Sequence, residues 1–328
     1  MAQAVWIGLA VVLMALSGAW GALAIAYLAP GSSAVRKGLS AVWSVLVVAA
    51  MGWLMYGRHG WPLLGYLLAL AALLLWWRSI APSNHRAWAD DVARTLSARI
   101  SGDRVTLHNV RNFDWRSDDD YDARWETRHY DLRQLNSADA IVSYWSRRAI
   151  AHAMISFGFA DGRHLVFSVE IRKRRGQAFS EIGGFFKQFE RILIAAEERD
   201  IVRVRSNVRG EDVYLYPLRM SRARRRALFV SYLNEANRRL RAPVWYHTIT
   251  SNCTTIVYRM ARQIAPGLPF DYRLLATGYL PQYLYAIGAL DKRQPLDVLT
   301  RQARITERAR ACCADEDFSQ AIRRGAAG

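Results

Sequence analysis

The N-terminal part of the chain alternates between long apolar stretches and short polar joints. Three stretches carry no charged side chain: Ala4 to Leu28, Leu39 to Tyr56 and Trp61 to Trp77. Each approaches or exceeds the about 20 apolar residues that a bilayer-spanning helix needs. The pattern predicts three transmembrane helices, and the second and third are short enough to cross with little tilt.

A cleaved signal peptide is the alternative for residues 1 to 28, with Ala24-Ile25-Ala26 as its processing site. This stretch has no basic side chain at its start, and two further apolar stretches follow it. Both features differ from a secretory signal, so an uncleaved anchor is the favoured interpretation.

The pattern changes after the joint Pro82-Ser83-Asn84, and we divide the chain there into a transmembrane region, 1–84, and a soluble domain, 85–328. A polar amphipathic run over 86–100 predicts a linker helix, and the charged run 114–128 predicts a surface loop. Apolar and β-branched runs predict strands at 105–110, 140–145, 152–159 and 164–171. Asp161-Gly162 between the last two is a strong hairpin signal.

The second half of the soluble domain contains both the helical spacing of apolar residues and the short apolar runs typical of strands. Apolar residues at helical spacing predict helices over 182–193 and 221–240, and short apolar runs predict strands at 201–205 and 212–216. A further helix begins near Cys253 and ends at Pro266-Gly267. This mixture predicts an α+β domain with a small, largely antiparallel sheet packed on helices.

Charge is distributed unevenly along the 328 residues. All 28 acidic residues follow position 84, and the first 84 residues hold four basic ones, so the net charge of +17 leaves +13 on the soluble domain. A basic surface attracts phosphate, whether in nucleic acid or in an anionic membrane. The attachment to three spans favours the membrane over nucleic acid, and a solvated basic face without a ligand is the alternative.

The three cysteines are Cys253, Cys312 and Cys313. The adjacent pair near the C-terminus implies no disulfide framework, because a bridge between neighbours is strained. The seven histidines are scattered, without a Cys-x-x-Cys or His-Glu-x-x-His pattern. We therefore expect neither a metal nor another cofactor.

Cys253 is the first candidate for chemistry. Ser251 and Asn252 are good N-cap residues, so the thiol falls in the first turn of a helix, where the helix dipole lowers the pKa of a thiol. His152 opens a predicted strand about a hundred residues earlier and is the best candidate for its base. Each residue also has an ordinary structural interpretation, a buried thiol and a satisfied strand histidine.

The hairpin register decides the third member of this set. A loop of residues 160–162 places Glu170 opposite His152, whereas a two-residue loop turns Glu170 to the other face of the sheet. Glu170 is thus the first candidate to orient the imidazole, and His164, near the turn, is the second. Glu170 also has an ordinary alternative as the partner of Arg172 or Arg174.

Three residues are supporting candidates around this set: Asn252, Tyr246 and Arg172. Tyr246, seven residues before Cys253, is a candidate to bind or polarise an acyl oxygen, with packing as its alternative. The backbone N–H of Cys253 at the helix start is a natural donor to an oxyanion.

Separated blocks of sequence carry a family resemblance. They are His152-Ala153 with Ser156-Phe157, Ser168-Val169-Glu170-Ile171-Arg172, Glu197-Glu198-Arg199-Asp200, Asp212-Val213-Tyr214-Leu215-Tyr216-Pro217, Asn252-Cys253-Thr254-Thr255, and Asp317-Phe318-Ser319 with Ile322-Arg323. Over roughly residues 85 to 328 the chain resembles the bacterial membrane-protein family defined by the N-terminal periplasmic domain of the lipoprotein N-acyltransferase Lnb. The order of histidine, polar residue and Asn-Cys also resembles permuted papain-like enzymes, including the lecithin–retinol acyltransferase group.

The resemblance implies a cysteine acyltransferase in which Cys253 attacks a lipid ester and His152 takes and returns the proton. Membrane phospholipid is the implied acyl donor, and a lipoprotein or another amine is the implied acceptor of the acyl thioester. The chain departs from Lnb because its apolar stretches precede the soluble domain and the C-terminal membrane region of Lnb is absent.

Two other functions fit the same residues. A cysteine amidase or peptidase acting on the cell wall uses the same thiol chemistry and differs only in the leaving group. A non-enzymatic, basic, membrane-tethered adaptor predicts instead that His152 and Cys253 lie beyond hydrogen-bond reach. The distance between the side chains of His152 and Cys253 therefore distinguishes the enzymatic hypotheses from the adaptor hypothesis.

The resemblance implies a multi-pass protein of the bacterial inner membrane with a periplasmic domain. The distribution of basic residues around the spans favours the opposite orientation. Three spans place the N-terminus and the soluble domain on opposite sides of the membrane. The basic residues on the side of the soluble domain are Arg36, Lys37, Arg78 and Arg86, whereas the other side has Arg58 and the α-amino group. The positive-inside rule thus favours a cytoplasmic domain. Because the charge difference is small, we follow the resemblance and expect a periplasmic domain.

Overall fold

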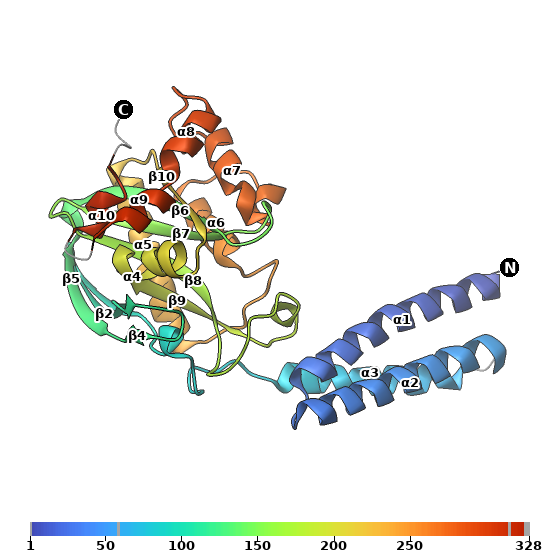
Figure 1. The fold of residues 1–328 in the computed structure, drawn as a ribbon. Helices are drawn as coiled ribbons and strands as arrows, with labels where there is room; N and C mark the ends of the chain where they lie inside the picture. The colour runs from blue at the N-terminus through green and yellow to red at the C-terminus, as the bar shows by residue number, and fades with distance from the viewer. Residues whose placement is uncertain (1, 58–59, 314–315, 325–328) are drawn as a thin grey trace. The chain divides into compact units, whose positions relative to one another are not determined.

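The structure is a computed structural model that describes residues 2–57, 60–313 and 316–324. Arg58, which enters the charge argument above, lies outside these residues. The chain forms two compact units (Figure 1). One comprises Met1–Ser83 with Phe179–Phe189, and the other comprises Asn84–Ala178 with Glu190–Gly328.

Three helices make up most of the first unit: α1 (Ala2–Leu28), α2 (Ser33–Gly57) and α3 (Trp61–Ser79). Each is long and apolar enough to cross a membrane, as the sequence predicts. Helices α1 and α2 approach closely at Gly18, where a Cβ atom would lie 2.6 Å from Cγ1 of Val47. Trp43 donates its indole N–H to the carbonyl of Gly18 at 2.9 Å. This bond gives the indole N–H a partner between two otherwise apolar helices.

The segment Phe179–Phe189 packs with these helices. The ring of Phe186 stacks on Tyr27 with centroids 5.5 Å apart and meets Trp77 edge-on at 6.2 Å. The predicted helix over 182–193 is wrong, because the structure has a 3₁₀ turn at Gly183–Phe185 followed by a strand. Phe186 thus meets α1 and α3, and Phe179 stacks on Phe189 within the segment, so these aromatic residues do not line one face of a helix.

The second unit is built on an eight-stranded sheet in the order β1-β2-β9-β8-β7-β6-β10, with β5 also paired to β2. The observed sheet is larger than the small, largely antiparallel sheet that the sequence predicts. It is also mixed, since β2 and β9 are parallel where Arg111 pairs with Ala196, whereas the other strand pairs are antiparallel. The strands are β1 (Ser97–Ser101), β2 (Arg104–Arg111), β5 (Trp125–Asp131), β6 (Leu135–Tyr144), β7 (His152–Phe159), β8 (His164–Arg172), β9 (Glu190–Ala196) and β10 (Asp212–Pro217).

A separate two-stranded hairpin pairs β3 (Asp114–Trp115) with β4 (Tyr121–Asp122), so the predicted surface loop over 114–128 contains strands. The predicted linker helix over 86–100 is a 3₁₀ turn at Asp90–Val92 that leads into β1. The predicted strand at 201–205 is helical, because α4 (Glu198–Arg203) continues into a π-helical turn at Val204–Val208.

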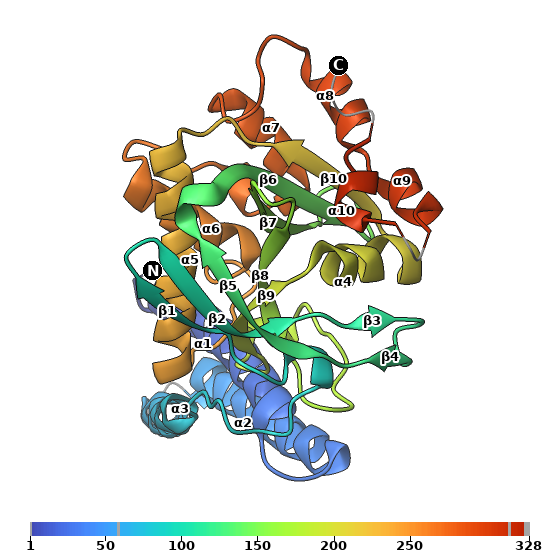
Figure 2. The ribbon, with the colours of Figure 1, turned by 90° about the vertical axis from the view of Figure 1, so that its left-hand side faces the viewer.

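The remaining helices follow β10: α5 (Arg222–Arg241), α6 (Cys253–Ile264), α7 (Leu280–Ala286), α8 (Leu296–Ala303), α9 (Thr306–Ala311) and α10 (Phe318–Ala321). Helices α5 and α6 bury apolar side chains against one face of the sheet, where Phe157, Phe167, Phe229 and Tyr232 meet. Helices α4, α9 and α10 cover the other face (Figure 2). Strand β7 is therefore buried along its whole length.

Candidate active site

The hairpin of β7 and β8 sets the position of His152. Gly158 pairs with His164, and the N–H of Phe159 donates to the carbonyl of Arg163 at 3.0 Å. The loop is therefore residues 160–162, the three-residue alternative, with Gly162 in the left-handed region at φ +86°. Continued two residues beyond the last ladder pair, Met154 with Ser168, this register brings Glu170 across from His152.

The imidazole of His152 faces two oxygen atoms from β8. Its Nε2 atom lies 2.7 Å from Oγ of Ser168 and 3.1 Å from Oε1 of Glu170. Ser168 donates its one hydroxyl hydrogen to the same Oε1 atom at 2.7 Å, so its Oγ accepts a hydrogen bond from the Nε2–H of His152. The network thus places a proton on Nε2, and Nδ1 is the nitrogen left to exchange a proton with a nucleophile.

Glu170 is held as a carboxylate. Burial alone would raise the pKa of Glu170, but the charges of His152 and Arg205, with hydrogen bonds from His152 and Ser168, keep the pKa well below its usual range. Arg205 donates from Nη2 to Oε1 of Glu170 at 3.0 Å. The carboxylate therefore stays charged at neutral pH beside the imidazole.

Cys253 is the first residue of α6. Asn252 caps the helix by accepting the N–H of Thr255 at 2.8 Å, and Thr255 returns its side chain to the backbone of Asn252, which completes a capping box. This cap fixes the helix start, and with it the place of the thiol, which is 7% exposed. The local sequence therefore determines the position of Cys253 along the helix.

The thiol and the imidazole interact directly. Burial alone would raise the pKa of Cys253, but the charge and hydrogen bond of His152, with the N–H of Ala153 and the hydroxyl of Thr254, lower it to about 7. Burial alone would lower the pKa of His152. The negative charge of Glu170, together with that of Cys253, outweighs burial and raises this pKa to about 9. Between these values the pair exists mainly as thiolate and imidazolium.

The adaptor hypothesis predicted that these two side chains would be separated. Instead, the two side chains lie close enough that each shifts the pKa of the other. A thiolate beside a protonated imidazole, with a carboxylate behind it, is the arrangement that thiol nucleophiles use. The site can therefore support nucleophilic chemistry at sulfur.

Arg205 is a member of the site that the sequence did not reveal. It lies in the π-helical turn and joins two carboxylates, Glu170 and Glu211, the latter at 3.4 Å from its Nη1 atom. Ser143 donates its hydroxyl to the same oxygen of Glu211. The run Glu197-Glu198-Arg199-Asp200 was the available signal, since acidic residues are typical of a first helical turn and contradict a strand that begins at residue 201.

The other candidates lie in different places. His164 donates from Nδ1 to the carbonyl of Gly162 at 3.0 Å, beside the hairpin turn and away from His152. Arg172 donates to the carbonyls of Val92 and Ala93, so it fastens the segment before β1 and does not contact the cluster of His152 and Glu170.

Asn252 serves as the helix cap described above, and Tyr246 is half-buried in the segment that precedes α6. A catalytic contribution from either residue stays a prediction. Within residues 2–57, 60–313 and 316–324, no three His, Cys, Asp or Glu side chains are grouped to hold a metal ion.

Comparison with known proteins gives one match. Residues 121–278 match the family model described as the Lnb N-terminal periplasmic domain, a range that includes His152, Glu170, Arg205 and Cys253. The match supports an Lnb-type domain over this part of the predicted range 85–328. No match is found among curated proteins or solved structures. The permuted papain-like fold and the likeness to lecithin–retinol acyltransferases stay predictions.

The ion pair predicts how the reactivity of the thiol depends on pH. In a chain with Cys312→Ser and Cys313→Ser, alkylation of Cys253 by iodoacetamide should reach half its maximum rate near pH 7. Glu170→Gln removes the charge that keeps His152 protonated, so less imidazolium is present to stabilise the thiolate. The midpoint should then move up toward the ordinary thiol value of about 8.5. A midpoint that stays near 7 in Glu170→Gln would contradict this account of the site.

Arg205 should matter for stability as well. Arg205→Met leaves Glu211 buried without its guanidinium partner and Glu170 with His152 alone. The loss of one partner from a buried ion pair costs about 3–5 kcal/mol. Denaturant titration of the full chain in micelles should show a loss of this size in the free energy of unfolding. Arg301→Met is the matched control, because the pair of Arg301 and Asp297 is exposed and such pairs contribute less than about 1 kcal/mol. Equal losses for the two variants would sink the interpretation.

Proposed function

We propose that this chain is a membrane-anchored, cysteine-dependent acyltransferase that acts on lipid esters. The observation that carries the proposal is the proximity of buried Cys253 and His152, which shifts the pKa of each, together with the ion pair of His152 with Glu170. Three helices able to cross a membrane and an Lnb-type domain indicate a membrane protein related to Lnb. The acyltransferase activity is the further step that we infer.

The first half-reaction forms the thioester. The thiolate of Cys253 attacks the carbonyl carbon of the ester, and the backbone N–H of Cys253 at the start of α6 stabilises the oxyanion. As the tetrahedral intermediate collapses, the carbon–oxygen bond of the ester breaks and His152 gives its proton to the departing alkoxide. The products are an acyl thioester on Cys253 and a lysolipid alcohol.

The second half-reaction transfers the acyl group. Neutral His152 takes a proton from the incoming amine, which attacks the thioester carbonyl, and the carbon–sulfur bond breaks. The amide leaves, and thiolate and imidazolium are restored. Glu170 holds the imidazole in one orientation throughout and favours its protonated form, which lowers the cost of each proton transfer.

Several features support a lipid substrate. The soluble domain carries a net charge of +13, which suits an anionic membrane surface. The segment between β8 and β9 packs Phe186 against the apolar helices and leaves Phe179 and Ile182 more than half exposed. Strand β8 carries Glu170, so this apolar segment follows the site directly in sequence. We place the domain in the periplasm by analogy with the domain that it matches.

The thioester is the testable intermediate. Incubation of the full chain with a phospholipid labelled in its acyl chain should leave label on the protein, and neutral hydroxylamine should release it. Cys253→Ala should remove this label completely, whereas Cys312→Ser with Cys313→Ser should retain it, since these cysteines lie outside the site. Label that persists on Cys253→Ala would remove the nucleophile from the mechanism, and turnover of peptidoglycan fragments alone would favour an amidase.

A further inference from the structure

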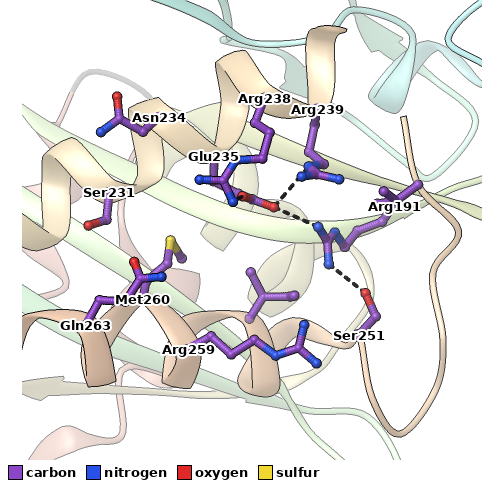
Figure 3. A pocket seen from close by; sticks show the side chains of 12 residues that line it. Arg191, Ser231, Asn234, Glu235, Arg238, Arg239, Ser251, Arg259, Met260 and Gln263 are labelled. Carbon is purple, nitrogen blue, oxygen red and sulfur yellow. Dashed lines mark hydrogen bonds and ion pairs between the residues drawn. The ribbon is translucent and has the colours of Figure 1, made fainter. Parts of the chain in front are cut away.

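A cavity of about 370 Å³ lies between α5 and α6, one helical turn along α6 from the thiol. Figure 3 shows side chains from both helices around it, with Arg191 of β9 at one end. Nothing in the proposed chemistry uses the charged side chains that line it. The cavity is therefore a separate feature that needs its own explanation.

The charge of the cavity is unbalanced. Its lining holds four arginines and one carboxylate, Glu235. Arg191, Arg239 and Arg238 all converge on this carboxylate, at 2.7, 3.1 and 3.3 Å. Burial, with other guanidinium groups nearby, lowers the pKa of Arg191 to about 10 even though Glu235 opposes it. One carboxylate cannot neutralise three cations, so this end of the cavity favours a further anion.

Arg259 adds a fourth positive charge from α6. Its guanidinium donates from Nη2 to the carbonyl of Thr250 at 2.6 Å, which orients it without neutralising its charge. Guanidinium groups bind phosphate oxygens through paired N–H donors and suit this role better than ammonium groups. The opposite end of the cavity is neutral and polar, with Ser231, Asn234 and Gln263 (Figure 3). A phosphate group that carries a hydroxylated substituent matches both ends.

The cavity is coupled to the start of α6. Arg191 donates from Nη1 to Oγ of Ser251, which directly precedes the capping residue of the helix. Ile256 lines the cavity and lies three residues after Cys253, about 4.5 Å along the helix axis. In a glycerophospholipid the phosphate and the acyl ester are separated by only a few covalent bonds. The distance from the cavity to the thiol is therefore similar to the distance from the phosphate to the acyl ester within one lipid molecule, so a phosphate bound in the cavity can present the ester to the thiol.

We propose that this cavity binds the phosphate group of a phosphate ester, with the lining arginines as its ligands. The assignment of that ester to the glycerophospholipid donor rests on the proposed function. Free phosphate has the same recognition chemistry, and the two sources differ in the apolar chains that only the lipid carries.

Calorimetric titration tests this in the full chain with Cys253→Ala, held in a phosphate-free neutral detergent. The probes are dihexanoyl phosphatidylglycerol, inorganic phosphate and dihexanoylglycerol, which lacks the phosphate. Because this chain has no thiol at position 253, the result does not depend on whether a thioester forms. We expect phosphatidylglycerol to bind more tightly than dihexanoylglycerol, and Arg259→Gln to weaken its binding about tenfold.

Arg262→Gln is the matched control, since Arg262 is exposed on the same helix and does not line the cavity. It removes the same charge and should leave the affinity within about twofold. Arg238→Gln, with Arg224→Gln as its control, repeats the test from α5 should Arg259→Gln disturb the loop at Thr250.

Phosphatidylglycerol that binds more tightly than inorganic phosphate, with both weakened by Arg259→Gln, supports a lipid headgroup site. Equal affinity for the two supports a phosphate site whose ligand is a free anion. Equal loss of affinity in Arg259→Gln and Arg262→Gln would reduce the effect to general charge attraction and overturn the proposal. Binding of neither phosphate probe would also overturn it.

Discussion

The site depends on one buried ion pair, the thiolate of Cys253 with the imidazolium of His152. Both side chains are less than a tenth exposed, and isolated charges at such positions are strongly disfavoured. Glu170 offsets part of that cost by stabilising the imidazolium, and Arg205, which lies between Glu170 and Glu211, keeps Glu170 charged. The charged state of the thiol therefore depends on a chain of alternating charges and not on the cysteine alone.

The fold supplies that chain from distant segments. Strand β7 lies in the middle of the sheet with both faces covered, so His152 at its start has little freedom to move. The hairpin loop of residues 160–162 fixes which face Glu170 occupies, and the capping box of Asn252 fixes where α6 begins. The π-helical turn after α4 brings in Arg205. Such turns are frequent at functional sites, and here one sets the position of a buried cation.

The sequence predicted the parts of the site that local signals control. The start of α6 follows from Asn252, and the pairing of Glu170 with His152 was one of two registers that Asp161-Gly162 allowed. Arg205 was missed because a short apolar run at 201–205 fits a strand or a buried helix equally well. Strand β9 was misread for a related reason, because Ile192 and Leu193 continue the helical spacing of the aromatic residues before them, of which Phe186 in fact packs with α1 and α3. Pairing between distant strands, such as the parallel contact of Arg111 with Ala196, has no local signal at all.

The protonation state of His152 tests the central claim most directly. Nitrogen NMR of the full chain with labelled histidine, with His152 assigned through His152→Gln, reports whether one or both ring nitrogens carry a proton. The account predicts a doubly protonated ring at about pH 8, because Glu170 and the thiolate raise the pKa of His152 to about 9, whereas an ordinary histidine is neutral there. A neutral ring at that pH would mean that the thiol and imidazole do not form an ion pair, and the proposed nucleophile would lose its physical basis.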